Sequence, residues 1–242
     1  MPTQRVPSPY DPYMPQVGCV LLVVMLAGLC LLPLFVLDAM GQALRKLHLP
    51  SAVATLTIAG ILIGGFINLP IYRLNRDEDQ PVLRGRLLPG VGWVPLPRTS
   101  RQTIVALNVG GCLIPAALAL YESRLVLDQA PQARWALALI SGVNIAVCYG
   151  LARPIPGVGI AIPAFVPPAV AVLLAWLLLN GEQYDLVRAP VAFVAGVAGP
   201  LIGADLFNLR RLGQLSAGLV SIGGAGTFDG IVISGLAAAF FA

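Results

Sequence analysis

The sequence is poor in charge, in histidine and in paired cysteines, and each shortage removes a class of protein. Only 11% of the 242 residues are charged, while 57% are hydrophobic. A soluble domain of this size could not cover so much apolar surface with so few charges. The single histidine and the four cysteines, which show no CxxC spacing, argue against a structural zinc site. No phosphate-binding loop or dinucleotide-binding glycine motif is found, so neither a metal nor a cofactor is expected.

Long apolar runs are what the sequence does contain. A membrane-spanning helix needs about 20 mostly apolar residues. These runs have neither the polar face of a soluble helix nor the alternation of barrel strands. We therefore predict an all-α, polytopic transmembrane helical bundle of about seven spans, the last broken or re-entrant at a glycine-rich stretch. The predicted spans are 17–37, 52–69, 103–120, 135–151, 159–179, 187–206 and 215–242.

The polar segments set the organisation of the chain. Residues 1–15 are rich in proline and polar side chains, which predicts an extended cytoplasmic tail. Residues 16–242 form the predicted transmembrane domain, with a long basic loop at 71–102. We expect this loop to lie at the cytoplasmic interface as a short ribbon, with Trp93 at headgroup level, as a surface anchor or a docking segment.

The basic residues are unevenly divided between the two sides of the predicted bundle. With seven spans, the tail and every second loop carry ten of the 15 lysines and arginines. Cytoplasmic loops of membrane proteins are enriched in these residues, so the N-terminus is expected in the cytoplasm and the C-terminus outside a prokaryotic inner membrane. The net charge of +4 then reflects topology and contact with membrane lipids, and no nucleic-acid partner is expected.

Acidic residues within the apolar runs are the strongest candidates for a functional site, because charge inside a bilayer is costly and usually functional. Asp205 lies in PLIGADLFNL and Asp229 in SIGGAGTFDGIVISG, each with apolar residues on both sides. Counting the helical rise from the outer surface places them at similar depths, ~24 Å and ~20 Å. Asp38, at the end of the first run, is expected to mark the interface.

Two carboxyls at one depth allow three interpretations. A pair sharing one proton could act as base on a water and as acid on a carbonyl, which peptide hydrolysis requires. The same acids could instead relay protons or hold a cation in a transporter. Each aspartate could also cap a helix or satisfy loose backbone, and Thr227 and Asp229 are suitable cap residues ahead of the final helix.

Glycines and isolated polar residues complete the predicted site. Gly203 precedes Asp205, and the stretch with Gly223, Gly224 and Gly226 permits irregular backbone. At membrane depth such backbone must be packed in protein or line a watery cavity, so we predict a cavity beside Asp229 that opens toward the cytoplasm.

Other residues are expected to support the bundle or the site. Arg153, in a segment broken by proline and glycine, is expected to be an interfacial anchor or a counter-ion for a carboxylate. Asn68 and Asn108 interrupt apolar runs and are expected to hydrogen-bond between helices. The small residues that would let helices approach closely are Gly60, Gly64, Gly65, Gly196 and Gly199.

The chain resembles a family of bacterial and archaeal polytopic membrane proteins known as the domain of unknown function sixteen-fourteen. The resemblance covers most of residues 50–242, and the last of its four segments is long and specific. It implies a multi-pass membrane fold and brings no established activity with it. The segments are LNVGGCLIP at 107–115, ARPIPGVGIAIP at 152–163, LIGADLFNL at 201–209 and SIGGAGTFDGI at 221–231.

A more distant similarity is to the intramembrane aspartyl proteases, including presenilin and the prepilin peptidases, whose consecutive catalytic helices carry one aspartate each. It implies that Asp205 and Asp229 are the catalytic pair. The second acid of those proteases stands in a GxGD setting, whereas Thr227 and Phe228 intervene here. We therefore expect a protease-like hydrolase acting on a transmembrane peptide. The alternatives are a small-solute or proton-coupled transporter and a non-catalytic membrane scaffold.

Overall fold

A computed structural model describes residues 14–75, 86–88, 92–94, 102–155, 159–209, 219–224 and 229–242. These residues form seven α-helices, two π-helical segments and three small sheets, so the predicted helical bundle is confirmed. The chain divides into two compact units, Met1–Met40 and Gly41–Ala242.

Helix α1 (Met14–Lys46) supplies the first unit and the beginning of the second. Its large apolar side chains from Val20 to Phe35 are each more than half exposed. A helix that is apolar all round and unburied by protein is suited to lipid. The helix begins at Met14, inside the predicted extended tail 1–15, and continues to Lys46, beyond the predicted end of the first span at residue 37. Residues 1–13 of the predicted tail lie outside the described residues.

Helix α6 (Asp185–Ala198) is the centre of the second unit. Every residue from Arg188 to Val197 is buried, and most of them are small or β-branched. This helix therefore has protein on all sides, in contrast to α1. The helices packed against it are α3 (Ile114–Gln129), α4 (Arg134–Leu151), α5 (Val166–Leu178) and α8 (Gly230–Phe241).

Glycines bring several of these elements into backbone contact, as predicted. A Cβ atom on Gly196 of α6 would lie 2.7 Å from the Ser234 carbonyl oxygen of α8. A Cβ on Gly64, at the end of α2 (Ser51–Gly64), would lie 2.8 Å from the Gly110 nitrogen. Side chains at these positions would force the paired elements apart, so the close approach depends on glycine.

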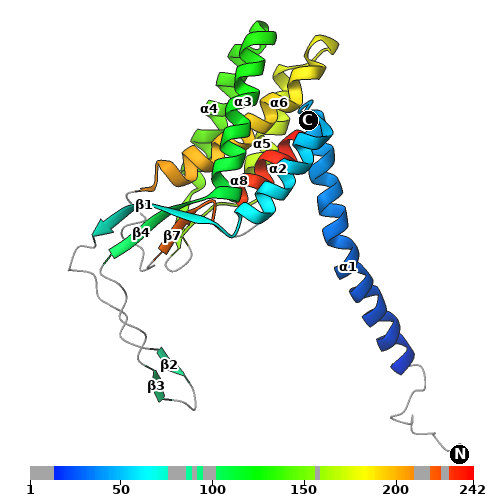
Figure 1. The fold of residues 1–242 in the computed structure, drawn as a ribbon, viewed down its shortest axis with the longest axis vertical. Helices are drawn as coiled ribbons and strands as arrows, with labels where there is room; N and C mark the ends of the chain where they lie inside the picture. Colours follow the sequence, from blue (N-terminus) through cyan, green and yellow to red (C-terminus); the bar gives the residue numbers. More distant parts are fainter. Residues whose placement is uncertain are drawn as a thin grey trace, which may run out of the picture. The chain divides into compact units, whose positions relative to one another are not determined.

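A three-stranded sheet was not predicted. It has the order β1-β4-β7, with β1 (Asn68–Asn75) antiparallel and β7 (Leu219–Ile222) parallel to the central β4 (Gln102–Asn108). Figure 1 shows the sheet at one end of helices α3 and α4. The predicted spans 52–69, 103–120 and 215–242 are therefore wrong at their strand residues. The β-branched run Thr103-Ile104-Val105 favours a strand, and pairing on both edges satisfies its backbone.

Two short ribbons accompany the helices. Strands β5 (Arg153–Ile155) and β6 (Gly159–Ala161) form a hairpin where the sequence predicts a break between spans. The next helix, α5, starts at Val166 rather than at the predicted residue 159, and its prolines 167 and 168 fall in the first turn, where no backbone N–H is needed.

In the predicted basic loop 71–102, β1 extends to Asn75 and Gln102 opens β4. Between them, β2 (Arg86–Leu88) and β3 (Gly92–Val94) form an antiparallel ribbon in which Leu87 stands opposite Trp93. Residues 76–85, 89–91 and 95–101 of the loop lie outside the described residues.

The apolar helices of the described chain fall into two groups by length. Four helical segments are long and apolar enough to cross a membrane: Gly18–Lys46, Val109–Gln129, Pro131–Leu151 and Glu182–Leu206. The shorter apolar helices are Ser51–Gly64, Val166–Leu178 and Gly230–Phe241. The chain is thus a membrane protein by its apolar helices, and the number of its crossings stays a prediction.

Candidate functional site

Two π-helical segments lie at the sheet end of the bundle. The first, η1 (Val109–Leu113), joins β4 to α3, and the second, η4 (Gly199–Leu206), continues α6. Helix α8 contacts both of them, and α4 packs along η4. Short π-helical turns are rare and frequently mark functional sites. The regular α-helical hydrogen-bond pattern is therefore interrupted in two segments that both contact α8, and Asp205 lies in the second of them.

The two predicted acids come together at this place. Asp205 is the second-last residue of η4 and is half-buried. Asp229 immediately precedes α8 and is also half-buried. The two carboxylates lie within range of each other's electrostatic field. The two acids therefore lie on segments, η4 and the start of α8, that pack against each other and are separated in sequence by the strand β7.

Two buried thiols belong to the same neighbourhood. Cys112 of η1 lies within the electrostatic range of both carboxylates, and Cys148 of α4 lies within that of Asp205. Cys148 also packs with Ala204 and Ala152, which closes the apolar side of η4. The acids are therefore bordered by η1 and α4 as well as by their own segments.

Glycines hold the segments around the acids in direct backbone contact. A Cβ on Gly203 would collide with the Ile145 carbonyl oxygen of α4, and one on Gly111 of η1 would collide with the Gly223 carbonyl oxygen. Gly223 itself has φ 70°, a conformation that side-chain-bearing residues rarely adopt. Gly203 and Gly223, both predicted as supporting residues, thus fix η4 against α4 and the end of β7 against η1.

Asn108 organises the strand side of the site. Its fully buried side chain donates from Nδ2 to the Gly65 carbonyl oxygen (2.8 Å) and to Asn68 Oδ1 (3.1 Å), and its Oδ1 accepts from the Gly111 backbone N–H (2.6 Å). The Ser221 hydroxyl of β7 donates to the same Asn68 oxygen. The predicted hydrogen bonds of Asn68 and Asn108 therefore exist, but they join strands and turns rather than two helices.

The remaining residues predicted for the site are not shown in contact with the two aspartates. Arg153 is exposed on the β5–β6 hairpin and, among the described residues, forms no ion pair with either aspartate. Gly224 follows β7, and its backbone N–H donates to the Ser221 carbonyl oxygen (3.2 Å). Gly226 and Thr227 lie in 225–228, outside the described residues. The predicted cavity beside Asp229 also falls partly on that segment.

Asp229 caps a helix, as one of the three interpretations expected. Its Oδ2 accepts a hydrogen bond from the Ile231 backbone N–H (3.1 Å) at the start of α8. Asn caps a helix about as well as Asp, whereas Ala leaves the N–H without a partner. We expect Asp229→Ala to lower the free energy of unfolding by ~1 kcal/mol and Asp229→Asn to change it little. Denaturation in mixed micelles measures both; equal loss in the two variants would contradict a capping role.

One buried acid escaped the sequence analysis. Glu122 is 1% exposed and lies in α3, beyond the predicted end of the third span at residue 120. The buried residues of α3 are spaced by four, three and four positions, and extending that helical period past Leu120 would have placed Glu122 on the buried face. They are Pro115, Ala119, Glu122 and Val126.

A metal centre finds no support in the residues that can be described. Across these ranges no three His, Cys, Asp or Glu side chains are grouped so that they could hold a metal ion.

Comparison with known proteins places the chain in a family. No curated protein and no solved structure matches it. A family model described as protein of unknown function (DUF1614) matches residues 62–241, which include both aspartates, Asn108 and Glu122. The match spans most of the chain, and the protein therefore belongs to this family of unknown function.

Proposed function

We propose that Asp205 and Asp229 are the paired acids of a membrane-embedded hydrolase that cleaves peptide bonds. The observation that carries the proposal is the packing of helix α8, which Asp229 caps, against η4, which holds Asp205, in segments that are otherwise apolar. Two like charges so placed disfavour double ionisation, so that one acid retains a proton while the other is a base.

The reaction needs no group beyond these two acids and water. The ionised carboxylate takes a proton from water as the water oxygen bonds to the peptide carbonyl carbon, and the protonated carboxyl gives its proton to the carbonyl oxygen. The carbon–nitrogen bond then breaks. The first carboxyl returns its proton to the amine nitrogen, and the second recovers a proton from a hydroxyl of the intermediate. The carboxylic acid and amine products then dissociate, and the two aspartates are again one ionised and one protonated carboxyl.

A transmembrane peptide is the proposed substrate. The site lies at the end of helices whose outer surfaces are apolar, and Leu206 and Phe207, next to Asp205, are 45% and 59% exposed. An apolar peptide segment can therefore reach the acids from the lipid side. We further propose that the chain crosses a prokaryotic inner membrane about seven times with its N-terminus in the cytoplasm, as the distribution of basic residues favours.

The test is loss of cleavage when either acid is neutralised. Full-length protein in liposomes is assayed on a library of single-span peptides. We expect Asp205→Asn and Asp229→Asn each to lower turnover by ~100-fold or more. Asp229→Asn keeps the cap of α8, so its loss would report chemistry rather than folding. Asp128→Asn is the matched control, because Asp128 is an exposed acid of α3.

Other outcomes overturn the proposal. Unchanged turnover in either aspartate variant removes the pair as the catalytic site. If the wild-type protein cleaves no peptide but moves protons or cations across the liposome membrane, and either variant stops that flux, the acids serve a transporter. If neither cleavage nor flux occurs, the protein is a non-catalytic scaffold.

A further inference from the structure

A pocket lies at the beginning of α6, away from Asp205 at the end of η4. The pocket, hereafter the Glu122 pocket, has a volume of about 180 Å³ and lies between the turn after α1, helix α3 and the beginning of α6. That volume is far more than one water requires. Its lining residues are Leu47, His48, Glu122, Leu125, Val126, Gln129, Leu186, Val187 and Pro190.

Glu122 supplies a buried acid for which the described part of the chain offers no hydrogen-bond or ion-pair partner. Its side chain is 1% exposed, and its Oε1 accepts no hydrogen bond. Arg188, which follows the lining residue Val187 in the sequence, is engaged elsewhere, because it forms an ion pair with Asp185 (2.9 Å) and donates to the Leu179 carbonyl oxygen. The ionised form of a carboxyl buried in this way is unfavourable, so the group is either protonated or balanced by a cation in the adjoining space.

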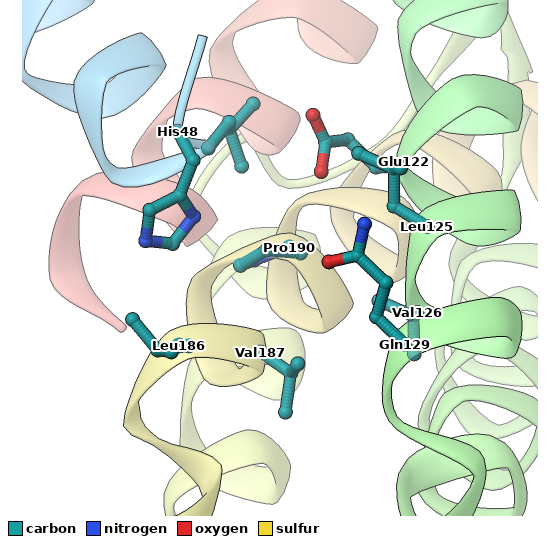
Figure 2. A pocket seen from close by; sticks show the side chains of 9 residues that line it. His48, Glu122, Leu125, Val126, Gln129, Leu186, Val187 and Pro190 are labelled. Carbon is teal, nitrogen blue, oxygen red and sulfur yellow. The ribbon is translucent and has the colours of Figure 1, made fainter.

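Two further polar groups face the same space. In Figure 2 the Glu122 carboxyl and the Gln129 amide extend from α3 into the pocket, and the His48 imidazole stands on the opposite side. His48 has φ 58°, a left-handed conformation that histidine adopts only at an energetic penalty. The exposed side chains of His48 and Leu186, the latter 69% exposed, mark where the pocket opens.

The remaining lining decides which cation fits. Six of the nine lining residues are apolar, and Glu122 and Gln129 are the oxygen-bearing side chains among them. Hard metal cations require about six or more oxygen ligands. An organic ammonium ion needs only a few acceptors for its N–H groups and gains from apolar contact with its hydrocarbon part. The lining therefore favours an amine over a metal ion.

We propose that the Glu122 pocket binds a small primary alkylammonium ion, with the Glu122 carboxylate as its counter-ion. The Gln129 carbonyl oxygen accepts a second N–H, and the leucine and valine side chains surround the alkyl chain. The pocket is separate from the aspartate pair, and the proposal does not depend on the hydrolase.

The probe is n-butylammonium chloride, with methylammonium, sodium and potassium chlorides as comparison ligands. Binding is measured on full-length protein in detergent by calorimetry and by the shift of the thermal unfolding midpoint. We expect butylammonium to bind more tightly than methylammonium, and sodium and potassium to produce no specific shift. Glu122→Gln should weaken butylammonium binding by roughly tenfold or more, since a neutral amide offers no counter-charge. The control Asp128→Asn should bind like the wild type.

A second variant guards against a folding defect. Val187→Phe fills the pocket from α6 and leaves the carboxyl in place, so it should also abolish binding. Glu122→Gln should unfold at or above the wild-type temperature without ligand, because it replaces a buried charge by a neutral group. The proposal is overturned if butylammonium does not bind the wild type, if Glu122→Gln binds it equally well, or if sodium binds as tightly.

Discussion

Asn108→Leu is expected to lower the free energy of unfolding by about 2–4 kcal/mol. The substitution leaves two buried backbone groups without partners, the Gly65 carbonyl and the Gly111 N–H. Each unsatisfied group costs about 1–3 kcal/mol, and leucine offers no hydrogen bond in return. The loss should reach the aspartate site as well, because Gly111 contacts Gly223 at the end of β7.

Unfolding in mixed detergent micelles, followed by circular dichroism, measures this change. Asn180→Leu is the matched control, since Asn180 is exposed and lies outside the helices. It should alter stability by no more than about 0.5 kcal/mol. An Asn108→Leu protein as stable as this control would show that the buried hydrogen bonds contribute nothing to the fold.

Gly110→Ala is expected to have a comparable or larger effect. A Cβ at this position would collide with the Ile61 carbonyl oxygen and the Gly65 nitrogen, and it would lie 2.8 Å from the Gly64 carbonyl carbon. All three atoms belong to backbone that cannot rotate away, so α2 must move from η1. Overpacking of this kind costs about 3 kcal/mol or more where the neighbours are rigid.

The control uses the same substitution where space is free. Gly142 lies in the middle of α4, and a Cβ there meets nothing within 4 Å. Gly142→Ala should therefore stabilise the protein by about 0.5–1 kcal/mol, through the higher helix propensity of alanine. Thermal unfolding of both variants separates the two cases. A Gly110→Ala protein that unfolds with the wild type would mean that α2 and η1 are not in fixed contact.

Composition and apolar runs were enough to predict the helical bundle, because few charges and long apolar stretches are compatible with few other folds. They were also enough to select Asp205 and Asp229, since an acid inside such a run stands out against its neighbours. The close approaches at Gly64 and Gly196 followed from the same logic of small residues between apolar helices.

The strands, and the contacts between residues far apart in the sequence, could not be predicted from local sequence patterns. The segment Gln102–Asn108 is apolar enough for a helix, and only its pairing with β1 and β7 makes it a strand. Glu122 was missed for a related reason: its helix continues through polar residues past Leu120, so an apolar-run criterion ended the span too early. Whether an acid is buried without a partner depends on α6 and the turn after α1, which no local window contains.

The parallel pairing of β4 with β7 has a consequence for biosynthesis. Ile104 of β4 lies opposite Leu219 of β7, so the two strands are made far apart in time on the ribosome. Until the later strand emerges, the nascent chain presents an open strand edge on β4, the kind of edge that invites misassembly and proteolysis. The aspartate neighbourhood closes only when the segment from Leu219 onward has been translated, which makes the assembly of this end of the protein a late event.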